Sequence, residues 1–262
     1  MKHPWITAEW LTAVGGAERV VEQLARIMPD ATVCSPVVYP GAVPAIDPRR
    51  IRAGSKRTSR IFARRQAAAA LNAAYWPSIS PVISRRANLV LASHHMASQW
   101  TAITSSVPHV VYVHTPARYA WFPEIDGRAS RGPAKVLATH IRAMDRRASR
   151  VVVSYAANSE TTRRRIQEVW NRDARVIHPP IVLDRFTGLE PTKTEPFLLA
   201  LSRLIPYKRL DFAIEVADAA GRRRVRVGQN GDARTGRIAG ERKRSLGGDR
   251  RRVARRASLA WP

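Results

Sequence analysis

The sequence has little of what builds disulfide-linked or membrane-spanning proteins. It contains one cysteine, Cys34, which cannot form a disulfide within the chain. It contains no run of about 18 to 20 uninterrupted apolar residues, the length that a helix needs to span a bilayer. The first residues carry Glu9 and no apolar run that ends in a small-residue cleavage site. We therefore expect a cytoplasmic protein, with peripheral attachment at the inner face of the cell membrane left open.

Acidic residues are scarce relative to basic ones. The chain has 262 residues, with 45 Lys+Arg against 20 Asp+Glu and a net charge of +25, which favours nucleic acid or an anionic membrane as partner. However, residues 221–262 hold 14 of the basic and only 3 of the acidic residues, with almost no periodic large apolar residues. Such a tail cannot bury a core of its own. The 45% hydrophobic content is that of a globular protein.

Short apolar runs alternate with helical patterns along the first part of the chain. The runs that predict strands lie at residues 31–38, 88–92, 109–113 and 150–154. The helical patterns lie at residues 17–28, 61–75 and 160–170. This alternation predicts an α/β fold with a parallel sheet covered on both faces. Polar motif residues follow the strands, where open α/β sheets place their ligands.

Proline and composition predict the domain boundaries. Pro179 and Pro180 interrupt the pattern, and a Lys/Thr/Pro stretch follows them. We expect an N-terminal Rossmann-like domain over residues 1–187 and the start of a second domain over 188–221. That second part opens with a strand at 197–201, followed by a helix. We expect residues 222–262 to be an irregular Arg-rich tail.

Five motifs together carry a family resemblance. They are Gly15-Gly16-Ala17-Glu18-Arg19; Val113-His114-Thr115-Pro116 with Arg118 to Trp121; Ala157-Asn158-Ser159; Ile177 to Ile181 with Asp184-Arg185-Phe186; and Ser202 to Asp211. In this order, over roughly residues 5–220, they resemble family 4 glycosyltransferases, especially mannosyltransferase-like members. The resemblance implies a GT-B architecture, with an acceptor-side domain and an incomplete second Rossmann-like domain that binds the nucleotide sugar.

Two departures from the family pattern stand out. The first strand is usually an apolar run, whereas the segment 1–10 is short and contains Pro4, so we expect a clipped or altered start. The family's Glu-x7-Glu element, which holds the donor sugar and ribose, has no counterpart after residue 211. The Arg-dense segment after Gly221 is typical of a truncated or frame-shifted gene product, and we expect weak or no turnover from such a chain.

Gly15, Gly16 and His114 are candidate site residues. A Gly-Gly pair before a helix lets backbone amides approach an anion, which suits a diphosphate, although an ordinary tight turn explains the pair equally well. His114 follows a predicted strand and so lies where the ligand crevice is expected. The resemblance implies that its side chain lies against the donor sugar.

Arg203 and Lys208 are the other candidates for binding and catalysis. Their charges suit the diphosphate of a departing nucleotide, and the alternative is a solvated basic turn. The resemblance implies that this pair stabilises the leaving group without a metal ion. No His/Cys/Asp/Glu cluster with ligand spacing and no Asp-x-Asp signature occurs, so we expect neither a metal nor a cofactor other than the donor.

Other residues keep less specific interpretations. The cluster Arg118, Tyr119, Trp121 and Phe122 is either an acceptor-side wall or loop packing. Cys34 is expected in the core. The remaining histidines, at positions 3, 94, 95, 109, 140 and 178, are expected to be ordinary surface residues. The pairs Arg49-Arg50, Lys56-Arg57, Arg64-Arg65 and Arg85-Arg86 suit docking to an anionic membrane, or simply solvated faces.

The resemblance implies transfer of a hexose, with retention, to a glycan or lipid-linked acceptor. Mannose from GDP-mannose is the expected donor, with a UDP-hexose as the other candidate. A non-enzymatic protein that binds nucleic acid or an anionic membrane is the alternative function, and an inactive remnant is a third. No nucleic-acid partner is expected, because no basic-aromatic stripe or groove-reading motif occurs.

Overall fold

The computed structural model describes residues 1–55, 57–58, 60, 68–125, 132–183, 187–188, 198–201, 209–220 and 225–228. The chain divides into two compact units, Met1–Leu183 and Asp184–Pro262. The motif Asp184-Arg185-Phe186, the candidates Arg203 and Lys208, and most of the Arg-rich tail lie outside the described residues.

The first unit is built on a seven-stranded sheet in which every described pair of strands is parallel. Its strands are β1 His3–Ala8, β2 Thr32–Ser35, β3 Ile51–Ala53, β4 Ala87–His94, β5 His109–Val113, β6 Ser154–Ala157 and β7 Arg175–Val176. Their spatial order is β3-β2-β1-β4-β5-β6-β7. The predicted parallel α/β sheet is therefore confirmed.

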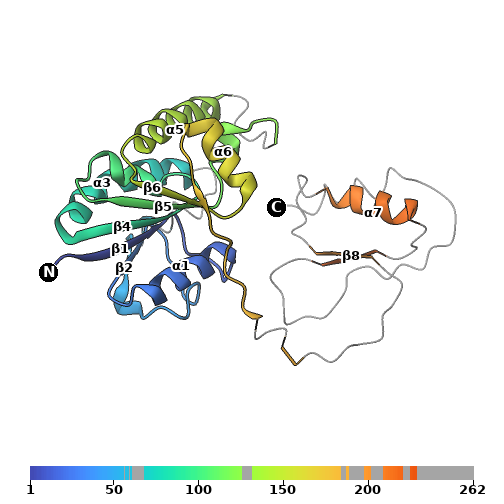
Figure 1. Cartoon of the computed structure of the whole chain (residues 1–262), viewed down its shortest axis with the longest axis horizontal. Coiled ribbons are helices and arrows are strands. Elements are labelled where there is room, and N and C mark those ends of the chain that lie inside the picture. Colours follow the sequence, from blue (N-terminus) through green and yellow to red (C-terminus); the bar gives the residue numbers. More distant parts are fainter. Residues whose placement is uncertain are drawn as a thin grey trace. The chain divides into compact units, whose positions relative to one another are not determined.

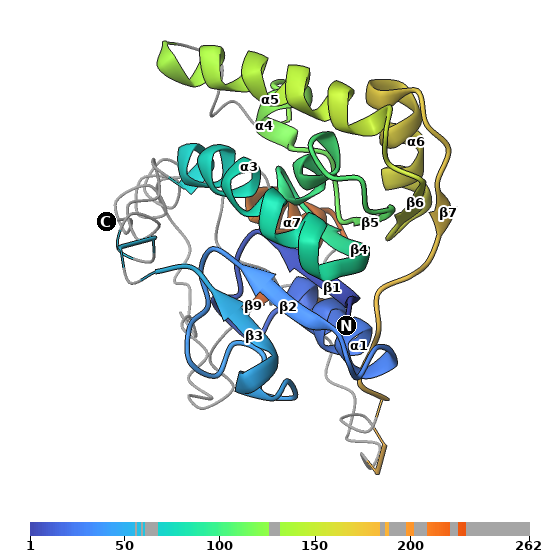
Figure 2. The ribbon, with the colours of Figure 1, turned by 90° about the vertical axis from the view of Figure 1, so that its left-hand side faces the viewer.

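Helices cover both faces of this sheet. They are α1 Gly16–Ile27, α3 Ala68–Arg86, α4 Arg118–Trp121, α5 Pro133–Ser149 and α6 Glu160–Trp170, with the short 3-10 helices η1 Pro48–Arg50 and η3 Ser98–Ile103. Helix α1 lies on one face, and α3, α5 and α6 lie on the other (Figures 1 and 2). The layered arrangement buries apolar clusters on both faces of the sheet.

Alternation along β1 explains how both faces are filled. Ile6 packs with Val21 of α1, whereas its neighbour Trp5 packs with Ile83 of α3 on the opposite face. Successive strand residues point to opposite faces, so one strand supplies both layers. Cys34 is fully buried beside Trp5, as expected, and burial raises the pKa of its thiol to about 11.

The proline in the first strand is accommodated at an irregularity. Although β1 is a central strand, its pairing with β4 shifts register between His3 and Pro4, and Pro4 then lies opposite Leu89. Proline has no N–H to donate to a ladder and is tolerated at such irregular positions. The segment that contains Pro4 is thus a strand that pairs on both sides, with a local shift of register at its start.

Helix α3 and strand β6 differ most clearly from their predicted bounds. Helix α3 continues to Arg86 through Pro77 and Pro81, because its buried face packs across the sheet and outweighs the lost helical hydrogen bonds. The strand expected at 150–154 lies instead at Ser154–Ala157. Helix α5 ends at Ser149, and directly after it the amides of Val151 and Val152 both bond back to the Ala148 carbonyl, so the chain is still turning where the strand was expected.

The second unit shows one strand-helix-strand pattern among its described residues. Strands β8 Leu198–Leu201 and β9 Val225–Gly228 pair in parallel, and α7 Leu210–Ala219 lies between them in sequence. Strand β9 falls in the segment that we expected to be irregular, because alternating Val225 and Val227 suit a strand. Within the described residues of both units, no helix is long and apolar enough to cross a membrane.

Candidate functional site

The strand order predicts a ligand site at the carboxyl ends of β1 and β4. The chain adds strands on one side of β1 and then crosses to β4 on the other, and sheets of this kind bind ligands at the carboxyl ends of the strands beside such a reversal. The polar and aromatic residues that end or directly follow these strands are Glu9 and Trp10 after β1, His94 and His95 at β4, His114 after β5 and Asn158 after β6.

His114 is held from two neighbouring strands. Its Nε2 atom lies 2.8 Å from the Ser93 hydroxyl of β4. Its carbonyl accepts hydrogen bonds from the side chains of Asn158 (2.9 Å) and Thr162 (3.3 Å). Among the described residues, its Nδ1 atom has no hydrogen-bond partner. Nδ1 is thus the ring atom that remains for a ligand.

The imidazole of His114 is neutral near physiological pH. Burial, reinforced by the adjacent His95, lowers the pKa of His114 to about 3. Burial also lowers the pKa of His95. A neutral imidazole offers one N–H donor and one acceptor nitrogen. The ring therefore suits a fixed hydrogen bond to a polar ligand group better than proton transfer at neutral pH.

A stack of three rings spans the carboxyl edge of the sheet. Trp10 stacks on His95 with a centroid distance of 5.6 Å and an interplanar angle of 11°, and His95 stacks on His114 at 4.3 Å and 14°. Tyr112 adds an edge contact to His114 at 5.3 Å. The stack joins residues from the ends of β1, β4 and β5, so the orientation of His114 depends on all three.

The expectation of ordinary surface histidines was wrong for three positions. His95 lies within the ring stack, and His94 and His109 are fully buried. His109 is fixed between the Thr101 hydroxyl and the Val107 carbonyl. The signal that could have identified His95 was its position directly after a strand, which it shares with His114.

Glu9 is a site residue that sequence reasoning missed. Its side chain is fully buried, and its Oε1 atom accepts hydrogen bonds from the four consecutive amides of residues 95–98, at 2.9 to 3.1 Å. The His94 Nδ1 atom lies 3.4 Å from the same oxygen. Burial alone would raise the pKa of Glu9, but the His94 contact, the charge of His95 and the Ser98 amide outweigh it and hold this pKa well below its usual range.

Gly15 and Gly16 begin α1 as predicted, but the helix start has its own carboxylate. Gly15 is the N-cap residue and no side chain caps the helix there. Glu18 is buried, and its Oε2 atom would lie 2.7 Å from a Cβ atom on Gly15. A carboxylate in the first turn complements the helix dipole. Glycine at position 15 leaves room for this side chain, and the diphosphate role of the pair stays a prediction.

The aromatic segment after His114 packs into the fold. The Trp121 indole donates a hydrogen bond to buried Asp145 of α5 (2.9 Å), and the Arg146 guanidinium lies over the same ring. Phe122 is buried beneath the guanidinium of Arg165. These contacts favour the loop-packing interpretation of Trp121 and Phe122 over an acceptor-side wall.

Comparisons with known proteins place this geometry in a family. The sequence matches the model of Glycosyltransferase Family 4 over residues 14–185, more than half of the chain. The chain belongs to glycosyltransferase family 4. No curated protein matches it.

Solved structures show a similar fold at low sequence identity. HepE (Alr3699) of Anabaena with UDP and glucose has a TM-score of 0.52 and 15% identity, covering 87% of this chain and 60% of HepE. The HepE complex with UDP gives 0.49 and 16%, covering 83% and 58%. The calicheamicin glycosyltransferase CalG4 gives 0.47 and 15%, covering 93% and 66%. The family 4 chain thus spans about 60% of the length of HepE. The predicted GT-B-type α/β fold class is confirmed.

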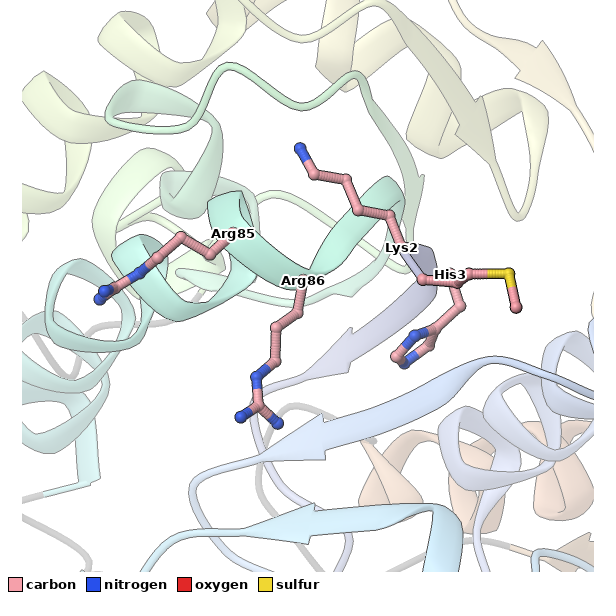
Figure 3. A pocket seen from close by; sticks show the side chains of 5 residues that line it. Lys2, His3, Arg85 and Arg86 are labelled. Atoms are coloured by element: carbon pink, nitrogen blue, oxygen red, sulfur yellow. The ribbon is translucent and has the colours of Figure 1, made fainter.

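A pocket of the first unit lies away from the carboxyl edge. Lys2 and His3 at the start of β1, with Arg85 and Arg86 at the end of α3, line it together with Met1 (Figure 3). These residues mark the amino ends of β1 and β4. In this family 4 chain the pocket is therefore separate from the edge where parallel sheets bind their ligands.

The other basic pairs have mixed placements. Arg50 donates to the carbonyls of Ala25 and Met28 and so caps the end of α1, and Arg49 pairs with Asp47. Lys56, Arg64 and Arg65 lie outside the described residues. In the part of the chain that the structure describes, no group of three or more His, Cys, Asp or Glu residues is placed to hold a metal ion.

Proposed function

We propose that this family 4 chain is the acceptor-side part of an enzyme that transfers a hexose from a nucleotide sugar to a glycan or lipid-linked acceptor. The observation that carries the proposal is His114, fixed at the carboxyl edge of the sheet with Nδ1 directed to no described residue. A neutral imidazole at this position donates a hydrogen bond to a sugar hydroxyl, or accepts one from it, and so orients the hexose.

The proposed donor is GDP-mannose, with a UDP-hexose as the second candidate. The mannosyltransferase-like motifs support the first, and the likeness in fold to HepE, a protein solved with UDP and glucose, supports the second. The amides of Gly15 and Gly16 would approach the diphosphate. Arg203 and Lys208 would neutralise the departing nucleotide without a metal ion.

Product analysis tests both transfer and its stereochemistry. We expect incubation with GDP-mannose or a UDP-hexose to release the nucleoside diphosphate slowly and without added divalent ions, in line with the weak turnover expected from the sequence. Proton NMR of the first-formed product is expected to show the anomeric configuration of the donor. An inverted anomer would contradict retention, whereas release that requires a metal ion would contradict the proposed role of Arg203 and Lys208.

We also propose that the protein binds peripherally to the inner face of the cell membrane. Arg85 and Arg86 at the end of α3 and Arg147 and Arg150 at the end of α5 are exposed and lie at the amino edge of the sheet. Each basic residue near an anionic bilayer contributes about 1 kcal/mol of attraction. We expect co-sedimentation with vesicles that contain phosphatidylglycerol, lost in high salt. Equal binding to uncharged phosphatidylcholine vesicles would contradict this proposal.

A further inference from the structure

We propose that Glu9 is a positioning residue: by binding the turn of residues 95–98, it holds the ring of His95 against His114 and so orients Nδ1 of His114 toward the ligand. This inference rests on the proposed function, because it assigns His114 a contact with the substrate. It concerns a residue outside the family motifs quoted above. It is based on the buried carboxylate of Glu9 and on the backbone amides of residues 95–98 that donate hydrogen bonds to it.

The first step is that Glu9 defines the conformation of the turn. Four successive amides point at one carboxylate oxygen, and the second oxygen lies 3.2 Å from the His95 amide. These amides follow β4 directly and include the start of η3, so they have no partners within the sheet ladder. Without Glu9 they would be buried donors with no acceptor, and the turn would rearrange to find others.

The second step is that this turn places His95. The amide of His95 is the donor that lies within hydrogen-bond distance of both Glu9 oxygens. Glu9, which directly follows β1, therefore fixes the backbone of His95. Trp10, the neighbour of Glu9 in sequence, stacks on the His95 ring. Glu9 holds the main chain of His95 and Trp10 contacts its side chain, so the end of β1 fixes one residue at the end of the neighbouring strand β4.

The third step leads from His95 to His114. The two imidazoles stack at 4.3 Å and nearly parallel, and the Ser93 hydroxyl holds Nε2 of His114. Ser93 lies in β4 and His95 follows this strand directly. The end of β4 therefore holds the His114 ring twice, by a hydrogen bond to Nε2 and by a stacked ring against its face. Rotation of His114 about its side-chain bonds requires the loss of one of these contacts. The direction of Nδ1 therefore depends on the Glu9 turn through the stacked His95 ring, together with the Ser93 bond to Nε2.

The test compares variants of Glu9 with a matched control. Glu9→Gln keeps the shape and one acceptor oxygen but removes the charge, and Glu9→Ala removes both. The control is Asp145→Asn, because Asp145 is another fully buried carboxylate that binds several N–H donors and does not contact the ring stack. The readouts are nitrogen-15 NMR of the histidine rings, which reports tautomer and ring stacking, and kcat and KM for transfer from the donor.

We expect the His95 and His114 ring signals to shift in Glu9→Ala, to shift less in Glu9→Gln and to stay unchanged in Asp145→Asn at a similar loss of thermal stability. We expect kcat/KM to fall by about 10- to 100-fold in Glu9→Ala, with partial recovery in Glu9→Gln.

Unchanged ring signals in both Glu9 variants would overturn the inference, as would an equal loss of kcat/KM in the control. Absence of turnover in the unmodified chain would contradict the proposed function alone, because the ring signals report the placement of His114 without it. If Glu9→Ala does not fold, the Glu9→Gln comparison decides.

Discussion

His114→Ala is expected to lower kcat/KM for sugar transfer by at least about 100-fold, the usual effect of removing one preorganised hydrogen-bonding group from a reaction site. The Nε2 bond to Ser93 and the stack on His95 fix this ring before any ligand binds, so the substitution removes a contact already in place. His114→Gln keeps one polar atom in a similar position and should retain more activity. Steady-state kinetics with the preferred donor measures both variants.

The pH profile provides the control for this prediction. Because the pKa of His114 is lowered to about 3, its ring is neutral throughout the range from pH 5 to pH 9. The His114 side chain should therefore contribute no inflection to the activity profile in that range. An inflection near the usual histidine pKa that disappears in His114→Gln would contradict the hydrogen-bonding role and favour proton transfer by this residue.

Asp145→Ala is expected to cause the largest loss of folding stability. Asp145 is fully buried and accepts hydrogen bonds from the side chains of Gln99 (3.0 Å), Trp100 (2.8 Å) and Trp121 (2.9 Å). Each buried donor left without an acceptor costs about 1 to 3 kcal/mol, so we expect a decrease of about 3 kcal/mol or more in the free energy of unfolding. Urea denaturation followed by tryptophan fluorescence measures this change.

An exposed carboxylate gives the matched comparison for Asp145. Asp173 pairs with Arg163 at 2.9 Å on the surface, where solvent screens the interaction. Asp173→Ala should shift the urea midpoint far less than Asp145→Ala does. Equal midpoints for the two variants would show that the buried network around Asp145 does not hold η3, α4 and α5 together as the hydrogen bonds indicate.

The sequence predicted the parts of the fold that periodicity and strand ends determine. The parallel sheet follows from short apolar runs between helices, and the position of His114 follows from its place directly after such a run. The strand predicted at 150–154 was placed too early in the chain, because apolar periodicity alone does not distinguish the end of a helix from the start of a strand. Pairing with β5 from Val110 to Val113 decides that register.

Glu9 and His95 were missed for a different physical reason. The partners of Glu9 are backbone amides that lie 86 to 89 residues away in sequence, and a backbone amide has no residue identity that a motif could record. The ring stack likewise forms only when three separate strand ends meet at one edge. Such contacts are properties of the folded sheet, so residue types and spacing can show that His95 follows a strand but not which residues it and Glu9 contact.

Isothermal titration of the chain with GDP-mannose, UDP-glucose, GDP and UDP tests the central claim most directly. The account predicts that one nucleotide sugar binds saturably with a Kd below about 1 mM, the usual upper range for enzyme substrates. It also predicts a larger Kd for the His114→Ala variant. Absence of heat with all four ligands at millimolar concentration, from a chain whose circular dichroism shows it to be folded, would contradict a nucleotide-sugar site in this chain.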